Sequence, residues 1–62
     1  MVPVLFTDMF GHKGQYYLYG TEGSQIETKW ETEFGDKGTA PTFDAARLAA
    51  RAALKLHWKK KA

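Results

Sequence analysis

The sequence predicts an α+β domain in which a three-stranded antiparallel meander sheet packs on one C-terminal α-helix, in the order βββα. Three observations lead to this prediction. Glycine-bounded turns divide the first part of the chain into short segments, residues 26–34 alternate between uncharged and charged side chains, and residues 43–60 are rich in alanine and contain neither glycine nor proline. We expect a single small domain over residues 1–62, because so short a chain supports only one hydrophobic core.

Three Gly-x-x-Gly segments, at residues 11–14, 20–23 and 35–38, punctuate the chain before the helix. Each predicts a turn, because glycine reaches the positive φ that tight connections require and the residues between the glycines are polar. Since short turns join neighbouring strands, we expect the three strands to pair antiparallel in sequential order.

Three strands are expected between these turns. The first spans residues 4–10, and the second spans residues 15–19 with large side chains on both faces, as in a central strand. The third spans residues 26–34 and is the most regular. Its uncharged residues alternate with charged ones: Ile26, Thr28, Trp30, Thr32 and Phe34 against Glu27, Lys29, Glu31 and Glu33. This alternation predicts one buried face and one charged face.

A helix is expected over residues 43–60, with Thr42 as its N-cap and Asp44 in its first turn. At about 100° per residue, one side gathers mostly small residues that would pack against the sheet, flanked by Phe43 and Leu54: Ala45, Ala46, Ala49, Ala50, Ala53 and Leu56. The opposite side carries cations four residues apart, with Trp58 alongside. We call these four cations the basic ladder: Arg47, Arg51, Lys55 and Lys59.

Charge is divided unequally along the chain. Residues 1–41 carry three lysines against six acidic residues, whereas residues 42–62 carry six basic residues against Asp44. Such an asymmetry is an argument about partners rather than about fold. The leading hypothesis is a non-enzymatic binding module that contacts nucleic-acid phosphates through the helix and the lysine tail, with Trp58 as a stacking neighbour. The candidate residues are Arg47, Arg51, Lys55, Trp58, Lys59, Lys60 and Lys61.

An ordinary solvated helix face would explain the same cations, since lysine and arginine favour helices and complement the dipole at a helix C-terminus. A third alternative is that the basic helix contacts an acidic protein surface. Charge by itself supplies only non-specific affinity for nucleic acid. The ladder therefore predicts a class of partner and no sequence specificity.

Aromatic side chains on the second strand form another candidate surface. If that strand is central, part of its aromatic set must point away from the helix. The glutamates of the third strand are expected on the same open face, where they would repel phosphates, so a protein contact fits this face better. The alternative function is a protein-interaction or inhibitor module, or a homodimer, that docks through Tyr17, Tyr19, Glu27, Glu31 and Glu33. Head-to-tail association of the two oppositely charged surfaces also remains open.

Enzymatic and metal chemistry find little support in the sequence. Glu31 and Glu33 would lie about 7 Å apart on a strand, near the spacing of an inverting glycosidase pair. Any strand with alternating glutamates gives this spacing, and we expect no cleft in so small a domain. There is no cysteine, neither His12 nor His57 has a partner at metal-ligand spacing, and no Gly-x-x-Gly segment opens the helix as a phosphate loop does. We expect no enzyme activity, cofactor, metal or small-molecule substrate.

No targeting or membrane-spanning segment is expected. The apolar run of residues 2–6 is too short for a signal-peptide core, and no stretch reaches the roughly 18 to 20 residues that span a bilayer. The lack of cysteine is compatible with a reducing compartment. We therefore expect a cytoplasmic protein that makes no membrane contact.

The start of the helix, Thr42-Phe43-Asp44 followed by residues 45–51, comes after a predicted three-stranded sheet. In this respect the chain loosely resembles the plant AP2 and integrase-arm DNA-binding domains, and the resemblance covers mainly the helix. Those domains read DNA with basic and aromatic residues on the sheet. The third strand here instead carries three glutamates and Lys29. The departure argues against a sheet that reads DNA and leaves the basic ladder as the candidate surface.

Overall fold

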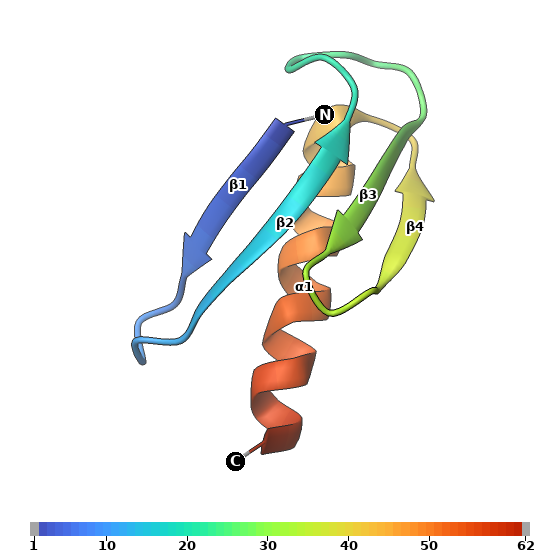
Figure 1. Cartoon of the computed structure of the whole chain (residues 1–62). Helices are drawn as coiled ribbons and strands as arrows, with labels where there is room; N and C mark the ends of the chain where they lie inside the picture. The colour runs from blue at the N-terminus through green and yellow to red at the C-terminus, as the bar shows by residue number, and fades with distance from the viewer. Residues whose placement is uncertain (1, 62) are drawn as a thin grey trace.

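The computed structural model describes residues 2–61, and its side chains through residue 60. The elements are β1 (Val2–Thr7), β2 (Lys13–Tyr19), β3 (Thr28–Thr32), β4 (Lys37–Ala40) and α1 (Phe43–Lys61). The four strands form one antiparallel sheet in sequential order, and α1 packs against one face of it (Figure 1). The predicted α+β meander with a C-terminal helix is confirmed, with one strand more than expected.

The additional strand, β4, comes from a segment that the sequence predicted to be a turn. β4 pairs with β3 so that Gly38 lies opposite Trp30. A Cβ on Gly38 would lie only 2.9 Å from the Trp30 indole, so this glycine is needed for close packing within a strand. The turn itself is confined to residues 33–36, where Gly35 has a φ of 93° and donates its N–H to the carbonyl of Thr32.

The outer two of the predicted strands are shorter at their loop ends than expected. β1 ends at Thr7, because the next residue, Asp8, begins a turn that its own carboxylate organises. β3 begins at Thr28, so Ile26 lies in the preceding loop and is exposed, and Phe34 lies in the following turn. The alternating pattern of residues 26–34 therefore describes a strand only at its centre.

The helix begins where the sequence predicts. The hydroxyl oxygen of Thr42 accepts a hydrogen bond from the backbone N–H of Ala45 at 3.1 Å, which confirms Thr42 as the N-cap. The N–H of Phe43 donates to the carbonyl of Ser24 in the β2–β3 loop, so this loop is tied to the first turn of α1.

The face of α1 that packs on the sheet is rotated from the predicted one. The buried residues are Phe43, Ala46, Ala50, Leu54 and Trp58. Leu56, which the sequence placed on the packing side, is 55% exposed. Leu54 and Trp58 bury far more apolar area than an alanine can, so these large residues determine which face turns inward.

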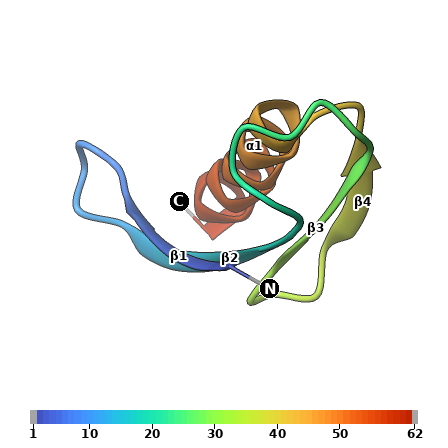
Figure 2. The ribbon, with the colours of Figure 1, turned by 90° about the horizontal axis from the view of Figure 1, so that it is seen from above.

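The core lies between α1 and the helix-facing sides of β2 and β3. Tyr16 and Leu18 of β2 are fully buried there, together with Thr28 and Thr32 of β3. α1 packs mainly on β2, β3 and β4. Figure 2 shows the sheet curving around α1 while the β1–β2 hairpin extends past the helix. The helix therefore covers the β1–β2 hairpin only in part, and this hairpin lies beside α1.

Candidate functional site

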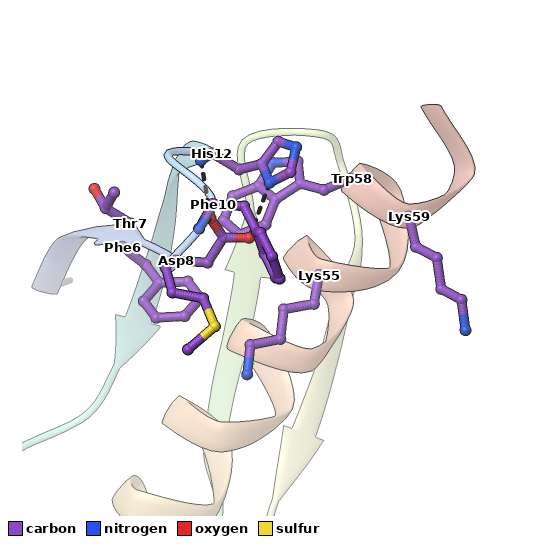
Figure 3. Close-up of a pocket in the computed structure, with 9 residues that line it drawn as sticks. Phe6, Thr7, Asp8, Phe10, His12, Lys55, Trp58 and Lys59 are labelled. Carbon is purple, nitrogen blue, oxygen red and sulfur yellow. Dashed lines mark hydrogen bonds and ion pairs between the residues drawn. The ribbon is translucent and has the colours of Figure 1, made fainter. Parts of the chain in front are cut away.

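A groove of about 610 Å³ lies between the β1–β2 hairpin and the C-terminal half of α1 (Figure 3). We call it the hairpin groove. The hairpin contributes Phe6, Thr7, Asp8, Met9, Phe10 and His12, and α1 contributes Lys55, Trp58 and Lys59. The expectation that so small a domain holds no cleft is therefore wrong. The groove exists because β1 reaches beyond the helix instead of packing under it.

Asp8 organises the turn that forms one wall of the groove. Its Oδ1 accepts hydrogen bonds from the backbone N–H groups of Phe10 and His12, each at 2.9 Å, and its Oδ2 lies 2.9 Å from Nδ1 of His12. Desolvation alone would raise the pKa of Asp8, but the hydrogen bonds from His12 and from the two amides outweigh it and hold the pKa below its usual value. Gly11, with a φ of 86°, completes the turn.

The same turn presents two large apolar side chains at the tip of the hairpin. Met9 is 89% exposed and Phe10 is 79% exposed. Figure 3 shows the Phe10 ring pointing from the turn toward the Lys55 side chain of α1. Exposed apolar side chains that adjoin a groove are typical of binding surfaces.

These hairpin residues were not among the predicted site residues, because the alternation of residues 4–10 predicted a strand. A signal was available: Asp8 stands three residues before Gly11, and an aspartate followed by a glycine at this distance is typical of a turn whose first residue binds the amides that follow. The alternating apolar residues that surround Asp8 concealed this signal.

Trp58 joins the helix to the hairpin. The Phe6 ring stacks on it with ring centroids 5.7 Å apart, and the His12 ring stacks on it at 5.3 Å. Gly14 allows this approach, since a Cβ there would lie 3.0 Å from the indole. Trp58 is only 7% exposed, so it belongs to the core and to the groove wall, whereas the sequence had placed it on the helix surface beside the basic ladder.

The basic ladder winds around α1 instead of following its outer side. Arg47 and Arg51 are partly buried, whereas Lys55 and Lys59 are exposed and line the hairpin groove. Residues four apart on a helix advance by about 40° beyond a full turn, which explains this drift. The Arg51 guanidinium lies 4.7 Å from the centre of the Phe6 ring, and Nζ of Lys55 lies 5.7 Å from it. The C-terminal part of the ladder therefore lies along the groove.

Two ladder residues also border a smaller hollow of about 220 Å³ between β1 and the N-terminal half of α1, which Tyr16 lines as well. Nε of Arg47, Nε of Arg51 and the Tyr16 hydroxyl are buried and have no hydrogen-bond partner among the described residues. Arg47 does make one ion pair, with Asp44 at 3.3 Å. This part of the ladder retains unused hydrogen-bond donors.

Lys60, a further predicted cation, does not line the groove. Lys60 is exposed, and its charge acts on Asp36. Desolvation would raise the pKa of Asp36, but hydrogen bonds from Thr32 and His57 and the nearby charges of His57 and Lys60 hold it below its usual value. The side chain of Lys61 lies outside the described part of the chain.

The open face of the sheet, opposite α1, carries the two predicted tyrosines. Tyr17 is partly buried and Tyr19 is exposed. The Tyr19 hydroxyl donates a hydrogen bond to Oε1 of Glu31 at 2.9 Å, and this bond to the carboxylate raises the pKa of Tyr19. Glu31 lies opposite Lys37 in the β3–β4 register.

The acidic cluster that the sequence placed on this face does not form. Glu27 lies in the loop before β3, and Glu33 lies in the turn after it. Oε1 of Glu33 accepts the backbone N–H of Gln15 at 2.7 Å, so this carboxylate completes the β2–β3 ladder. Glu31 is left with Lys29 and Lys37 as open-face neighbours, and the face is mixed in charge.

Among the described residues, no group of three histidine, cysteine, aspartate or glutamate side chains is placed to hold a metal ion. Over residues 2–61, no helix combines the length and the apolar character needed to cross a bilayer. The hairpin groove, with its aromatic walls and lysines, is larger than the hollow that Arg47 and Arg51 border.

The fold and the groove together define a small α+β meander domain with a cationic, aromatic-lined groove between a hairpin and a C-terminal helix. No protein-family model matches the chain, and no curated protein or solved structure is significantly similar to it. The function is therefore argued from the geometry of the site.

Proposed function

We propose that this protein is a non-enzymatic module that binds nucleic acid, largely through phosphates, with the basic ladder and the hairpin groove as its binding surface. The observation that carries the proposal is the ion pairing of the cations beside the groove. Among the described residues, Arg51, Lys55 and Lys59 have no acidic side chain within salt-bridge distance. A phosphate can approach these three cations without displacing an existing ion pair.

The dimensions of the ladder suit a polyanion. From Arg47 to Lys59 the helix rises by roughly 18 Å at about 1.5 Å per residue. A nucleic-acid strand places a phosphate at about every 3.4 Å of helix axis, so the ladder is as long as roughly five nucleotides. Each phosphate that a cation neutralises releases counterions, and this release is the main source of affinity.

Charge reversal tests the proposal. We choose Lys55→Glu with Lys59→Glu, because both lysines are exposed, whereas Arg51 packs over Phe6. The matched control is Lys29→Glu with Lys37→Glu, which changes the net charge equally on the open face of the sheet. Labelled single-stranded and duplex DNA and RNA are titrated at several salt concentrations. For single strands, the loss of two phosphate contacts lowers the slope of log K against log salt by about 1.4.

The two variants give distinguishable outcomes. The proposal predicts that the control retains the slope of the unaltered protein while the ladder variant loses part of it. An absence of binding even at low salt would refute the proposal. An equal loss in both variants would show that net charge, and not the ladder, determines binding.

A protein partner on the open face is the second candidate function, and one observation favours it. Leu5 of β1 is 64% exposed and lies on the same face as Tyr17 and Tyr19 of the neighbouring strand β2. An apolar and aromatic surface of this kind suits a protein contact or a homodimer. The dispersed glutamates no longer add a uniform negative charge to it. The same titration separates the two candidates, because this second function requires no affinity for nucleic acid.

A further inference from the structure

We infer that the hairpin groove receives unpaired bases of a single-stranded nucleic acid, so that the module prefers single strands to duplexes. This inference rests on the proposed function and adds to it the class of nucleic acid. It depends on three properties of the groove: the chemistry of its walls, the position of its charges and its rigidity.

The walls of the groove are more apolar than phosphate binding requires. Phe6 and Trp58 form its aromatic base, and the exposed side chains of Met9 and Phe10 extend one wall outward. In a duplex, the faces of the bases are covered by their stacked neighbours. In a single strand they are accessible, and proteins bind them by stacking on aromatic side chains.

The positive charges of the groove are placed where they can contact the phosphates of a bound nucleic acid. Lys55 and Lys59 line the groove from α1, and Figure 3 shows the Lys55 side chain near the Phe10 ring, whereas the Lys59 side chain extends away from the hairpin. Asp8 is the acidic residue among the described groove-lining residues, and its carboxylate is engaged by His12 and two backbone amides. A base placed against Phe10 would therefore have its phosphate beside a lysine and would meet no free carboxylate.

The groove is also preformed and of suitable size. Its volume of about 610 Å³ lies within the range of sites that hold small organic groups, so it has room for a base. The turn is fixed by the Asp8 hydrogen bonds, and the stacking of His12 on Trp58 fastens it to α1. A preformed groove loses little conformational entropy when it binds a ligand.

The test compares nucleic acids that differ in whether they offer unpaired bases. Oligothymidylate, an abasic deoxyribose-phosphate strand of equal length and a duplex are titrated at one low salt concentration. The altered protein carries Met9→Ser and Phe10→Ser, and both positions are exposed, so the fold should be retained. The matched control carries Leu48→Ser and Leu56→Ser, which removes two exposed apolar side chains from α1 outside the groove.

The expected result is that the unaltered protein binds oligothymidylate more tightly than the abasic strand, by about five- to a hundred-fold for one stacked base. The Met9 and Phe10 variant should lose this preference, while the Leu48 and Leu56 variant should keep it. Circular dichroism of both variants verifies that each is folded.

Other outcomes separate this inference from the proposed function. Equal binding of oligothymidylate and the abasic strand would overturn the base-binding inference and leave phosphate binding intact. Failure to bind any of the nucleic acids would overturn both. A polyglutamate peptide that matched the affinity of oligothymidylate would show that the protein responds to negative charge without recognising bases, and would also overturn the inference.

Discussion

Asp8 and Asp36 each tie a hairpin turn to a histidine. Asp8 binds His12, whose ring stacks on Trp58 of α1, and Asp36 contacts His57, which α1 itself contributes. Each carboxylate also stabilises its own turn. Asp36 does so by accepting a hydrogen bond from the Thr32 hydroxyl at 2.9 Å. The C-terminal half of α1 is therefore fastened to the sheet at two points by ionised carboxylates.

These carboxylates should make the fold sensitive to acid. The pKa values of Asp8 and Asp36 are lower in the folded protein than the value of about 3.9 for an unfolded aspartate. The unfolded chain therefore binds more protons, and the stabilisation is present above about pH 4 and is lost as the pH falls through the folded-state pKa.

The substitution Asp36→Asn tests this contribution. It should lower the free energy of unfolding at pH 6 and reduce the further loss of stability between pH 5 and pH 3, because one of the two titrating carboxylates is gone. Urea denaturation followed by circular dichroism measures both quantities. An unchanged dependence on pH would show that Asp36 contributes no linked stability.

At the scale of elements, the orientation of α1 decides what the basic ladder can do. The large residues Leu54 and Trp58 turn inward, and Leu56 turns outward. This rotation brings Arg51 over Phe6 and places Lys55 and Lys59 beside the hairpin groove. With the alanine face packed against the sheet, as the sequence predicted, the ladder would have pointed away from the hairpin.

A pair of matched substitutions tests the orientation of the helix. Leu54→Ala removes a fully buried side chain and should cost about 2 to 5 kcal/mol of unfolding free energy. Leu56→Ala makes the same chemical change on an exposed position, and its effect should stay within about 0.5 kcal/mol. Urea denaturation of both variants gives the comparison. Similar losses would mean that both leucines pack, contrary to the orientation described.

The hairpins explain why one strand was missed. In the segments 11–14 and 35–38, the first glycine has a positive φ and belongs to the turn, whereas the second lies in a strand under a tryptophan. Gly14 makes room for Trp58, and Gly38 makes room for Trp30. In the sequence the two glycines of each segment look alike. Only the side chain that packs against the second glycine shows that this glycine belongs to a strand.

At the scale of the whole molecule, the acidic and the basic residues differ in how many of them are engaged by other groups of the protein. Four of the six acidic residues in the first part of the chain are hydrogen-bonded to side chains or backbone amides: Asp8, Glu31, Glu33 and Asp36. The cations beside the hairpin groove have no such ion-pair partners among the described residues. The unpaired charge next to the groove is therefore positive.

Three features could be predicted from the sequence because each depends on a local pattern: the α+β class, the sequential antiparallel strand order and the N-cap at Thr42. It also placed the four ladder cations on the helix, but it did not predict what surrounds them. The groove arises because β1 extends past the helix and because Asp8 turns residues 8–12 toward α1. The first is a tertiary effect that no local periodicity records, whereas the Asp8 turn is local and was concealed by the alternating apolar residues around it.

The most direct test of the account is to map the binding surface by the amide chemical shifts of ¹⁵N-labelled protein titrated with oligothymidylate. The account predicts that the shifts concentrate in the turn at residues 8–13 and in α1 from residue 51 to residue 60, and that the open-face residues of β3 and β4 change little. Shifts concentrated on Tyr17, Tyr19 and Glu31, with the hairpin groove unaffected, would contradict it.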